Sequence, residues 1–284
     1  FEAPKSSNFS LKSQNLRHKV HQRLNRLCSH VLASKFHSLS VSNMSAQESS
    51  ETTAKTIYRK AYQPPPFLAP KVDLKIDLQF NDDEESLVTS TVQYFKNKNG
   101  PGGDLTLQGE KKPAAMRLVD VVINDQKCTD YLLEDTQLVI PAKALSDQAK
   151  VQITTAVQPH KNTTFQGLYK SGGNFCTQME AEGYRNMSYF QDRPDVMSTY
   201  KVHITAPKKG YPWLLSNGNL EEEGKRADGK HWVRWVDPFP KPSYLFALVA
   251  AKLDKKEDQF TTFSGKEVTL AFYVEPGKLD QCEF

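Results

Sequence analysis

The segment 175–185 places acidic and amide side chains at the spacing of a β-strand. Because side chains alternate across a strand, Gln178, Glu180 and Glu182 are expected on one face. Two carboxylates and an amide on one face, beside the glycines at 172–173, can hold a cation such as a protonated amine. Taken alone, however, the same pattern is more typical of a solvated strand face, because runs of charge usually face water.

The two carboxylates also allow a second chemistry, an acid–base pair. Neighbours at period two on a strand put their carboxylates about 6–7 Å apart, which is compatible with glycoside-type hydrolysis. No other motif in the chain supports Glu180 and Glu182 in this role. This hypothesis would make the chain an enzyme of a different class, active without added metal.

Four further blocks surround the segment, at 168–172, 192–195, 211–219 and 237–250. Together with the Gln-x-Glu-x-Glu-Gly run at 178–183, their order and spacing resemble the aminopeptidase N family, the zinc-dependent alanyl aminopeptidases of the bacterial and plant type. The resemblance covers roughly residues 58–282. The block 237–250, which reads Asp-Pro-Phe-Pro-Lys-Pro-Ser-Tyr-Leu-Phe-Ala-Leu-Val-Ala, is long and unusual in composition, so a chance match is improbable.

The resemblance implies substrate-binding roles in this chain and no catalytic ones. It assigns Glu180 to the free α-ammonium of a peptide substrate and Gln178 to the pocket for the first side chain. A charged hydrogen bond of this kind contributes ~1.5–3 kcal/mol. Glu182 shares the expected face, and we interpret it as structural. The preferred first residue and the oligomeric state do not follow from the sequence.

The chain lacks the zinc-binding motif of the resembled family. That motif is a helical His-Glu-x-x-His pair with a later Glu, accompanied by a Gly-x-Met-Glu-Asn strand, and none of the seven histidines here is followed by Glu. A helical zinc site needs two imidazoles four residues apart. We therefore expect zinc in the parent family but none bound by this chain, which corresponds to the N-terminal portion truncated before the chemistry. The alternative is a short isoform that serves as a non-catalytic β-module, binding peptides or an aminopeptidase partner.

Size and charge restrict the remaining classes. A chain of 284 residues with a net charge of +4 is expected to form one or two domains. Residues 1–50 carry a net charge of +5, which leaves the rest near neutral and argues against nucleic-acid binding. Four scattered cysteines without a C-x-x-C pair favour a reducing compartment. No apolar run is long enough to span a bilayer.

The first 50 residues have the composition of an organellar leader. They are rich in serine, basic and poor in acids, and Leu16, Val20 and Leu24 recur at helical spacing. This pattern is typical of a transit peptide, disordered until it meets a membrane or receptor, rather than of a secretory signal. We expect the chloroplast, with the mitochondrion second and a cytoplasmic form starting at Met44 as a further alternative.

The remainder of the chain predicts an all-β fold, a sandwich or saddle. Apolar and polar residues alternate over 72–80, and further strands are expected at 87–95, 117–123, 137–140, 150–157, 201–206, 230–236 and 243–253. The Asp228-Gly229 pair predicts a tight hairpin between 220–224 and 230–236. Many short strands with regular turns favour this class.

Three further expectations concern organisation. The chain divides into a leader and linker at 1–57, an aminopeptidase N-like N-terminal β-domain at 58–252, and the first strands of a truncated catalytic domain at 253–284, which include a hairpin of 259–263 and 267–273. Asp192 and Pro194 indicate the start of a helix. The three tryptophans are expected to serve packing rather than a ligand cage.

Overall fold

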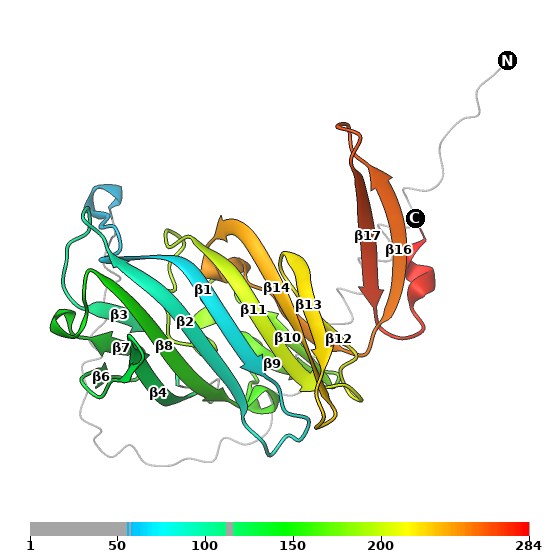
Figure 1. Ribbon diagram of the computed structural model, residues 1–284, viewed down its shortest axis with the longest axis horizontal. Helices are drawn as coiled ribbons and strands as arrows, with labels where there is room; N and C mark the ends of the chain where they lie inside the picture. Colours follow the sequence, from blue (N-terminus) through cyan, green and yellow to red (C-terminus); the bar gives the residue numbers. More distant parts are fainter. Residues whose placement is uncertain (1–55, 57, 112–115, 284) are drawn as a thin grey trace, which may run out of the picture. The chain divides into compact units, whose positions relative to one another are not determined.

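The computed structural model of the protein describes residue 56 and residues 58–111 and 116–283 (Figure 1). Residues 57–284 group into one compact unit. The predicted transit peptide, its helical pattern and Cys28 lie outside the described residues. Within them, Cys128, Cys176 and Cys282 are free thiols, and no helix is long and apolar enough to cross a membrane.

Seventeen strands lie in the described residues, and they form four sheets. Their bounds are β1 Phe67–Asp77, β2 Ser86–Lys96, β3 Leu105–Gln108, β4 Arg117–Ile123, β5 Gln126–Lys127, β6 Leu132–Leu133, β7 Gln137–Ile140, β8 Gln148–Val157, β9 Gly167–Ser171, β10 Asn174–Gln178, β11 Ser198–Pro207, β12 Trp213–Ser216, β13 Asn219–Lys225, β14 Lys230–Lys241, β15 Leu248–Ala251, β16 Asp254–Thr261 and β17 Glu267–Val274. Six short 3-10 helices complete the structure: η1 Arg59–Ala61, η2 Ala142–Ala144, η3 Pro159–Lys161, η4 Tyr184–Asn186, η5 Ser243–Leu245 and η6 Leu279–Cys282. The all-β prediction is confirmed.

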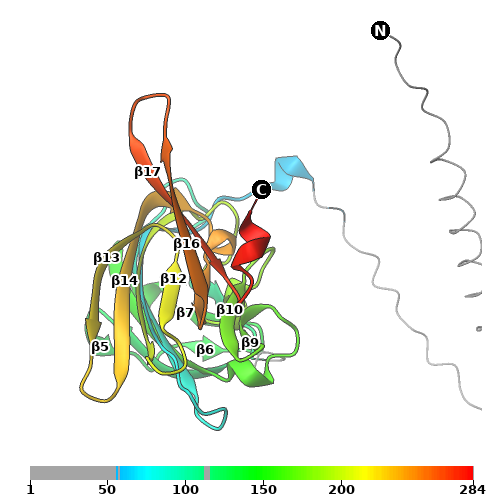
Figure 2. The same cartoon turned by 90° about the vertical axis from the view of Figure 1, so that its right-hand side faces the viewer.

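The largest sheet has eight strands in the order β13-β14-β11-β1-β2-β8-β4-β5. Its neighbouring strands are antiparallel except β1 and β11, which pair in parallel with Lys71 opposite Thr199. Behind it in Figure 1 lie a four-stranded sheet, β12-β15-β10-β9, and a three-stranded sheet, β3-β7-β6. The side view in Figure 2 shows these smaller sheets forming a second layer against the large one.

The core lies between these layers, and the period-two pattern of β1 explains how. Val72, Leu74 and Ile76 are at most 1% exposed, whereas Lys75 between them faces solvent. Burying such side chains contributes roughly 1.5–3 kcal/mol each. Strand 72–80 was predicted correctly in register, but it begins earlier, at Phe67, and ends at Asp77.

Most other predicted strands are present, and one expected strand is only partly formed. Strands 117–123 and 137–140 are confirmed with their bounds, and the Asp228-Gly229 turn joins β13 to β14 as predicted. The strand expected at 243–253 is wrong in its first half, where η5 precedes the short strand β15. Pro240 and Pro242 remove two backbone donors just before this point, so the ladder cannot continue without interruption.

The hairpin of β16 and β17 forms a sheet of its own. Within the described residues it pairs with no other strand, and Phe260, Leu270 and Phe272 on one of its faces are exposed. Trp213 of β12 connects to this region, because its indole N–H donates to the Leu253 carbonyl and its ring lies 5.0 Å from that of Tyr273. The tryptophans are thus half-buried packing residues, as expected.

His231 ties the beginning of β14 to the loop before β12. His231 is only 5% exposed, and its Nε2–H donates to the Tyr211 carbonyl at 2.7 Å. The ammonium of Lys208 lies 3.5 Å from Nδ1. Burial, and then the nearby Lys208 charge, lower the pKa of His231 below its usual range. The folded protein therefore prefers the neutral imidazole.

We predict that His231 makes the protein less stable in mild acid. Because the folded pKa lies below that of the unfolded chain, the unfolded chain takes up the proton first; the stabilisation is complete above about pH 6.5 and falls as the pH drops below it. Urea unfolding between pH 7 and pH 5 should show a shallower loss in His231→Gln, whose amide N–H can still reach Tyr211. An identical pH dependence in both proteins would contradict the assignment.

Candidate functional site

The acidic segment is a strand followed by a turn, not a continuous strand. β10 ends at Gln178, opposite Gly167 of β9, and the chain then turns at 180–183. The Gly183 N–H closes this turn on the Met179 carbonyl at 2.7 Å. The expectation of three side chains on one strand face is therefore wrong. The glycines at 172–173 form the hairpin turn at the opposite end of β10, so they do not neighbour Glu180 either.

Gly183 permits the turn because the backbone comes close to itself there. A Cβ atom at this position would lie 2.2 Å from the Gln178 carbonyl oxygen and 2.8 Å from the Met179 Cα. Every larger residue would therefore force the backbone apart. The φ angle of Gly183 is −77°, so close approach rather than conformational freedom requires glycine.

The residue after the turn anchors it in the core. Tyr184, the first residue of η4, is fully buried, and its ring packs 5.3 Å from Phe190 and 6.1 Å from Phe246. Burial raises the pKa of this phenol well above its usual value. The turn thus places exposed residues at 180–182 directly before a rigidly packed side chain.

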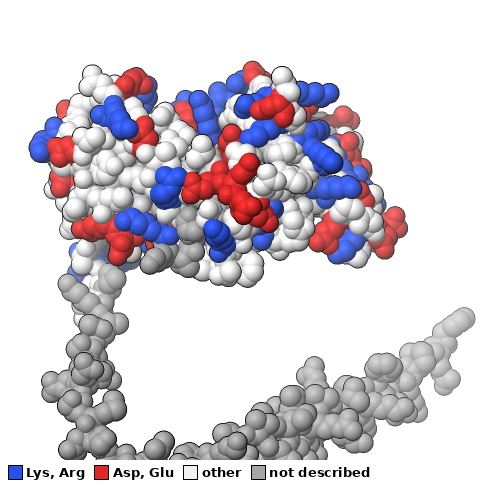
Figure 3. Space-filling model, turned by 90° about the horizontal axis from the view of Figure 1, so that it is seen from below, with Lys and Arg blue, Asp and Glu red and all other residues white. Residues whose placement is uncertain are grey.

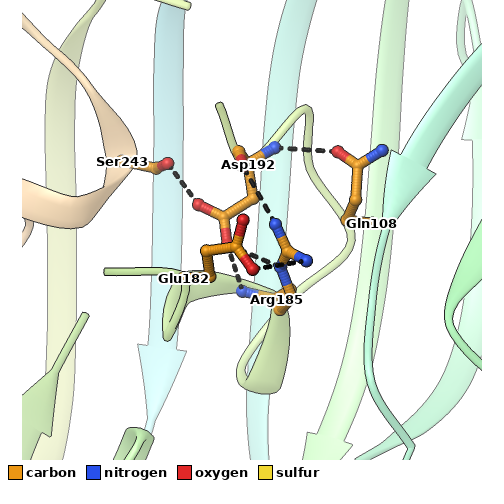
Figure 4. A network of polar contacts seen from close by, with 5 residues as sticks. All are labelled: Gln108, Glu182, Arg185, Asp192 and Ser243. Carbon is orange, nitrogen blue, oxygen red and sulfur yellow. Dashed lines mark hydrogen bonds and ion pairs between the residues drawn. The ribbon is translucent and has the colours of Figure 1, made fainter. Parts of the chain in front are cut away.

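A buried carboxylate organises the surroundings of the turn. The Asp192 side chain is 2% exposed, and its Oδ2 accepts hydrogen bonds from the backbone N–H of Arg185 at 3.2 Å and from Arg185 Nε at 3.1 Å (Figure 4). Its Oδ1 accepts the Ser243 hydroxyl at 2.5 Å, and its backbone N–H donates to the Gln108 amide oxygen at 3.1 Å. One residue therefore joins η4, η5 and β3.

The helix expected at Asp192 is absent, and this network is the physical reason. A helix N-cap directs its side-chain oxygen to the backbone two or three residues ahead. The Asp192 carboxylate instead binds backward in the chain to Arg185 and across to Ser243. The Pro194 segment consequently forms a turn before β11.

Arg185 pairs with one of the two exposed glutamates of the turn and not with the other. Arg185 Nη1 lies 3.1 Å from Glu182 Oε2, so the charge of Glu182 is paired. Within residues 58–111 and 116–283, no hydrogen bond or ion pair reaches the Glu180 carboxylate. Gln178 Nε2 donates to the backbone carbonyl of Glu180 at 3.2 Å, which fixes the start of the turn. Glu180 is therefore free to bind a ligand.

Glu180 stands on the wall of a cleft of about 300 Å³. Three segments line this cleft: 180–182, 192–194 and 243–244. The sequence predicted Glu180 here but missed Ser243 and Tyr244, which η5 brings in from far along the chain. Gln178 lies next to the cleft without lining it. On the face shown in Figure 3, acidic side chains gather in one patch near the middle.

Arg193 lines the cleft, and its side chain pairs with residues outside the cleft. Its guanidinium makes two contacts with the Asp195 carboxylate, at 2.8 and 2.6 Å, and donates to the Gln63 carbonyl at 2.9 Å. The hydrogen bonds from Arg193 lower the pKa of Asp195, and the Tyr62 hydroxyl donates to the same carboxylate at 2.8 Å. Arg193 is therefore neutralised and does not compete for Glu180.

The part of the chain that the structure describes holds no group of three or more His, Cys, Asp or Glu side chains with the geometry of a metal site. Of the acidic side chains around the cleft, Glu182, Asp192 and Asp195 pair with arginines. Glu180 has no partner among the described residues.

Comparison with known proteins identifies relatives of the whole β-body. The Peptidase M1 N-terminal domain family matches residues 70–245. The chain is 42% identical over 229 residues to aminopeptidase N of Haemophilus influenzae and 43% identical over 224 residues to aminopeptidase N of Escherichia coli. These alignments cover 80% and 79% of this chain and 25% of each relative. The chain thus spans about a quarter of the length of the curated relatives it matches.

Solved structures agree with this. The structure of Legionella pneumophila aminopeptidase A in complex with aspartic acid has a TM-score of 0.73 at 35% identity, covering 79% of this chain and 26% of that one. An M1 zinc metallopeptidase from Deinococcus radiodurans, with a TM-score of 0.62 at 14% identity, shares the fold over 76% of this chain and 49% of its own.

We predict that Gly183→Ala displaces the turn and destabilises the protein by about 1–3 kcal/mol, because the new methyl group overlaps the Gln178 carbonyl. Denaturant unfolding and the backbone amide shifts of residues 178–186 measure the two effects. Ala181→Ser, at an exposed position of the same turn, should remain within about 0.5 kcal/mol of the unsubstituted protein. Unchanged stability and shifts in Gly183→Ala would show that the turn tolerates a side chain.

Proposed function

Because the chain belongs to the M1 peptidase family, we propose that its β-domain holds the amino end of a peptide for a zinc aminopeptidase. The observation that carries this proposal is the Glu180 carboxylate, which is exposed on a cleft wall and without a partner in the described residues. A free α-ammonium is the group that distinguishes the first residue of a peptide from its interior. A fixed carboxylate is the simplest group that can bind it.

The proposed step is binding and orientation, with no bond cleaved by this chain's described residues. The α-ammonium donates to Glu180, and the turn that bears Glu180 is braced on a packed core, so the first residue is held at a fixed place. Such fixation contributes to catalysis by positioning the scissile bond. In this proposal Gln178, which holds the turn through the Glu180 carbonyl, contributes to the pocket for the first side chain. The described residues contain no ligand set for zinc, and in this proposal other parts of the whole enzyme hold the metal.

The proposed division of labour follows the chain. Residues 58–252 form the substrate-binding β-domain, which the family match over 70–245 supports. Residues 253–284 form the first strands of the catalytic domain, which the separate sheet of β16 and β17 supports. The relatives are about four times longer than their matched part, and the activity of a whole protein of that length is part of this proposal.

We also propose the chloroplast as the location, from the serine-rich and basic composition of residues 1–50. Fusing these residues to a fluorescent protein in plant cells tests it. Signal in mitochondria or throughout the cytosol would reject the chloroplast.

We predict that Glu180→Gln lowers kcat/KM for free peptides by about 10- to 150-fold, the factor that corresponds to ~1.5–3 kcal/mol for a charged hydrogen bond. The assay uses a zinc-bearing enzyme that contains residues 58–252, such as Escherichia coli aminopeptidase N with its matching N-terminal part replaced. Zinc content should not change, because Glu180 is not a ligand in this proposal.

Two comparisons make this test specific. Glu84→Gln removes an equivalent exposed charge in the loop between β1 and β2, and it should leave kcat/KM unchanged. N-terminally acetylated peptides lack the ammonium and should be poor substrates of the unsubstituted enzyme. If acetylated and free peptides are turned over equally well, Glu180 has no role in reading the amino end.

A further inference from the structure

We propose that Arg185 is a positioning residue: its ion pair with Glu182 leaves Glu180 as the carboxylate at the cleft that has no partner among the described residues and can accept a cation. This inference rests on the proposed function for the identity of the ligand. That Arg185 pairs with Glu182 and not with Glu180 is a property of the chain itself and can be tested without that ligand.

Each of the three guanidinium nitrogens of Arg185 has a partner. Nη1 lies 3.1 Å from Glu182 Oε2, Nε donates to Asp192 Oδ2 at 3.1 Å, and Nη2 donates to the Asp192 carbonyl at 3.1 Å (Figure 4). The Arg185 side chain is 15% exposed, whereas that of Glu182 is 65% exposed. The arginine therefore lies between the turn and the protein interior, and it pairs with the more exposed Glu182 from that side.

The charge balance explains what this contact does. Glu180 and Glu182 lie in one turn and line the same cleft, so without a cation beneath them the cleft would present two free carboxylates. A second charge at about 4 Å is worth about a fivefold change in affinity for each unit of ligand charge, even at the dielectric constant of water. Arg185, which Glu182 shares with Asp192, thus lowers the negative charge at the cleft by one unit and favours ligands of lower positive charge.

The fold around Arg185 does not depend on its side chain alone. Its backbone N–H donates to Asp192 Oδ2 at 3.2 Å, and its carbonyl accepts the Glu110 N–H at 2.8 Å. Asp192 also keeps its contacts with Ser243 and Gln108. Substituting the side chain is therefore expected to lower stability, since Asp192 loses its cation, while retaining the turn.

The first test uses Mn²⁺ as a probe of paired carboxylates on the full chain. Paramagnetic broadening of the amide signals of residues 180–183 should occur in Arg185→Gln at an Mn²⁺ concentration at least about fivefold lower than in the unsubstituted chain. The double variant Arg185→Gln with Glu182→Gln should return to the original concentration, and Arg185→Lys, which keeps the charge, should stay there. Arg226→Gln, which removes a charge paired with Asp228 away from the cleft, is the matched control.

The second test uses two amines that differ in charge, L-alaninamide and L-lysinamide, titrated at pH 7 and followed by the same amide signals. The ratio of their affinities should shift about fivefold towards L-lysinamide in Arg185→Gln and return in the double variant. Thermal unfolding of each variant verifies that it is folded.

The outcomes separate the two proposals. Mn²⁺ broadening at the same concentration in Arg185→Gln and the unsubstituted chain overturns the positioning role, and so does a change that the double variant fails to reverse. Failure of both amines to bind the unsubstituted chain, with the Mn²⁺ pattern as expected, contradicts amine binding by this chain and leaves the pairing of Arg185 with Glu182 established.

Discussion

The buried carboxylate of Asp192 is the constraint on which the cleft depends. An ionised group with 2% exposure is costly unless hydrogen bonds replace its water, and here Arg185 and Ser243 supply them. These partners come from segments about sixty residues apart in the chain. The requirement to satisfy one charge therefore fixes the positions of all three walls of the cleft. In a cleft built on separate surface loops, no shared contact of this kind would fix the loops relative to one another.

The arrangement assigns opposite tasks to similar side chains. Asp192 and Asp195 are acids that arginines satisfy within the protein, and they act as structure. Glu180, in contrast, projects from a turn that is held on both sides, by Gly183 behind it and by the Gln178 amide before it. Rigid support for a free charge is what a binding site needs, since the cost of ordering the group is met during folding.

The sequence was sufficient for the β-architecture but not for the geometry around Glu180. The alternation in β1 and the Asp228-Gly229 turn are local signals, and both were correct because burial of one face decides them. The spacing of Gln178, Glu180 and Glu182 is equally regular, yet the chain turns, because Gly183 can approach the end of β10 more closely than any other residue. The partnership of Asp192 with Ser243 spans 51 positions and leaves no periodic trace. Residues 1–50 stay a prediction throughout.

The parallel pairing of β1 with β11 sets the order in which this β-body can be assembled. The two strands are joined across residues 71 and 199, so the centre of the large sheet is completed only after most of the body has been synthesised. Contacts between such distant positions are formed late and slowly. During translation the free edge of β1, whose other edge pairs with β2, therefore stays open until β11 leaves the ribosome.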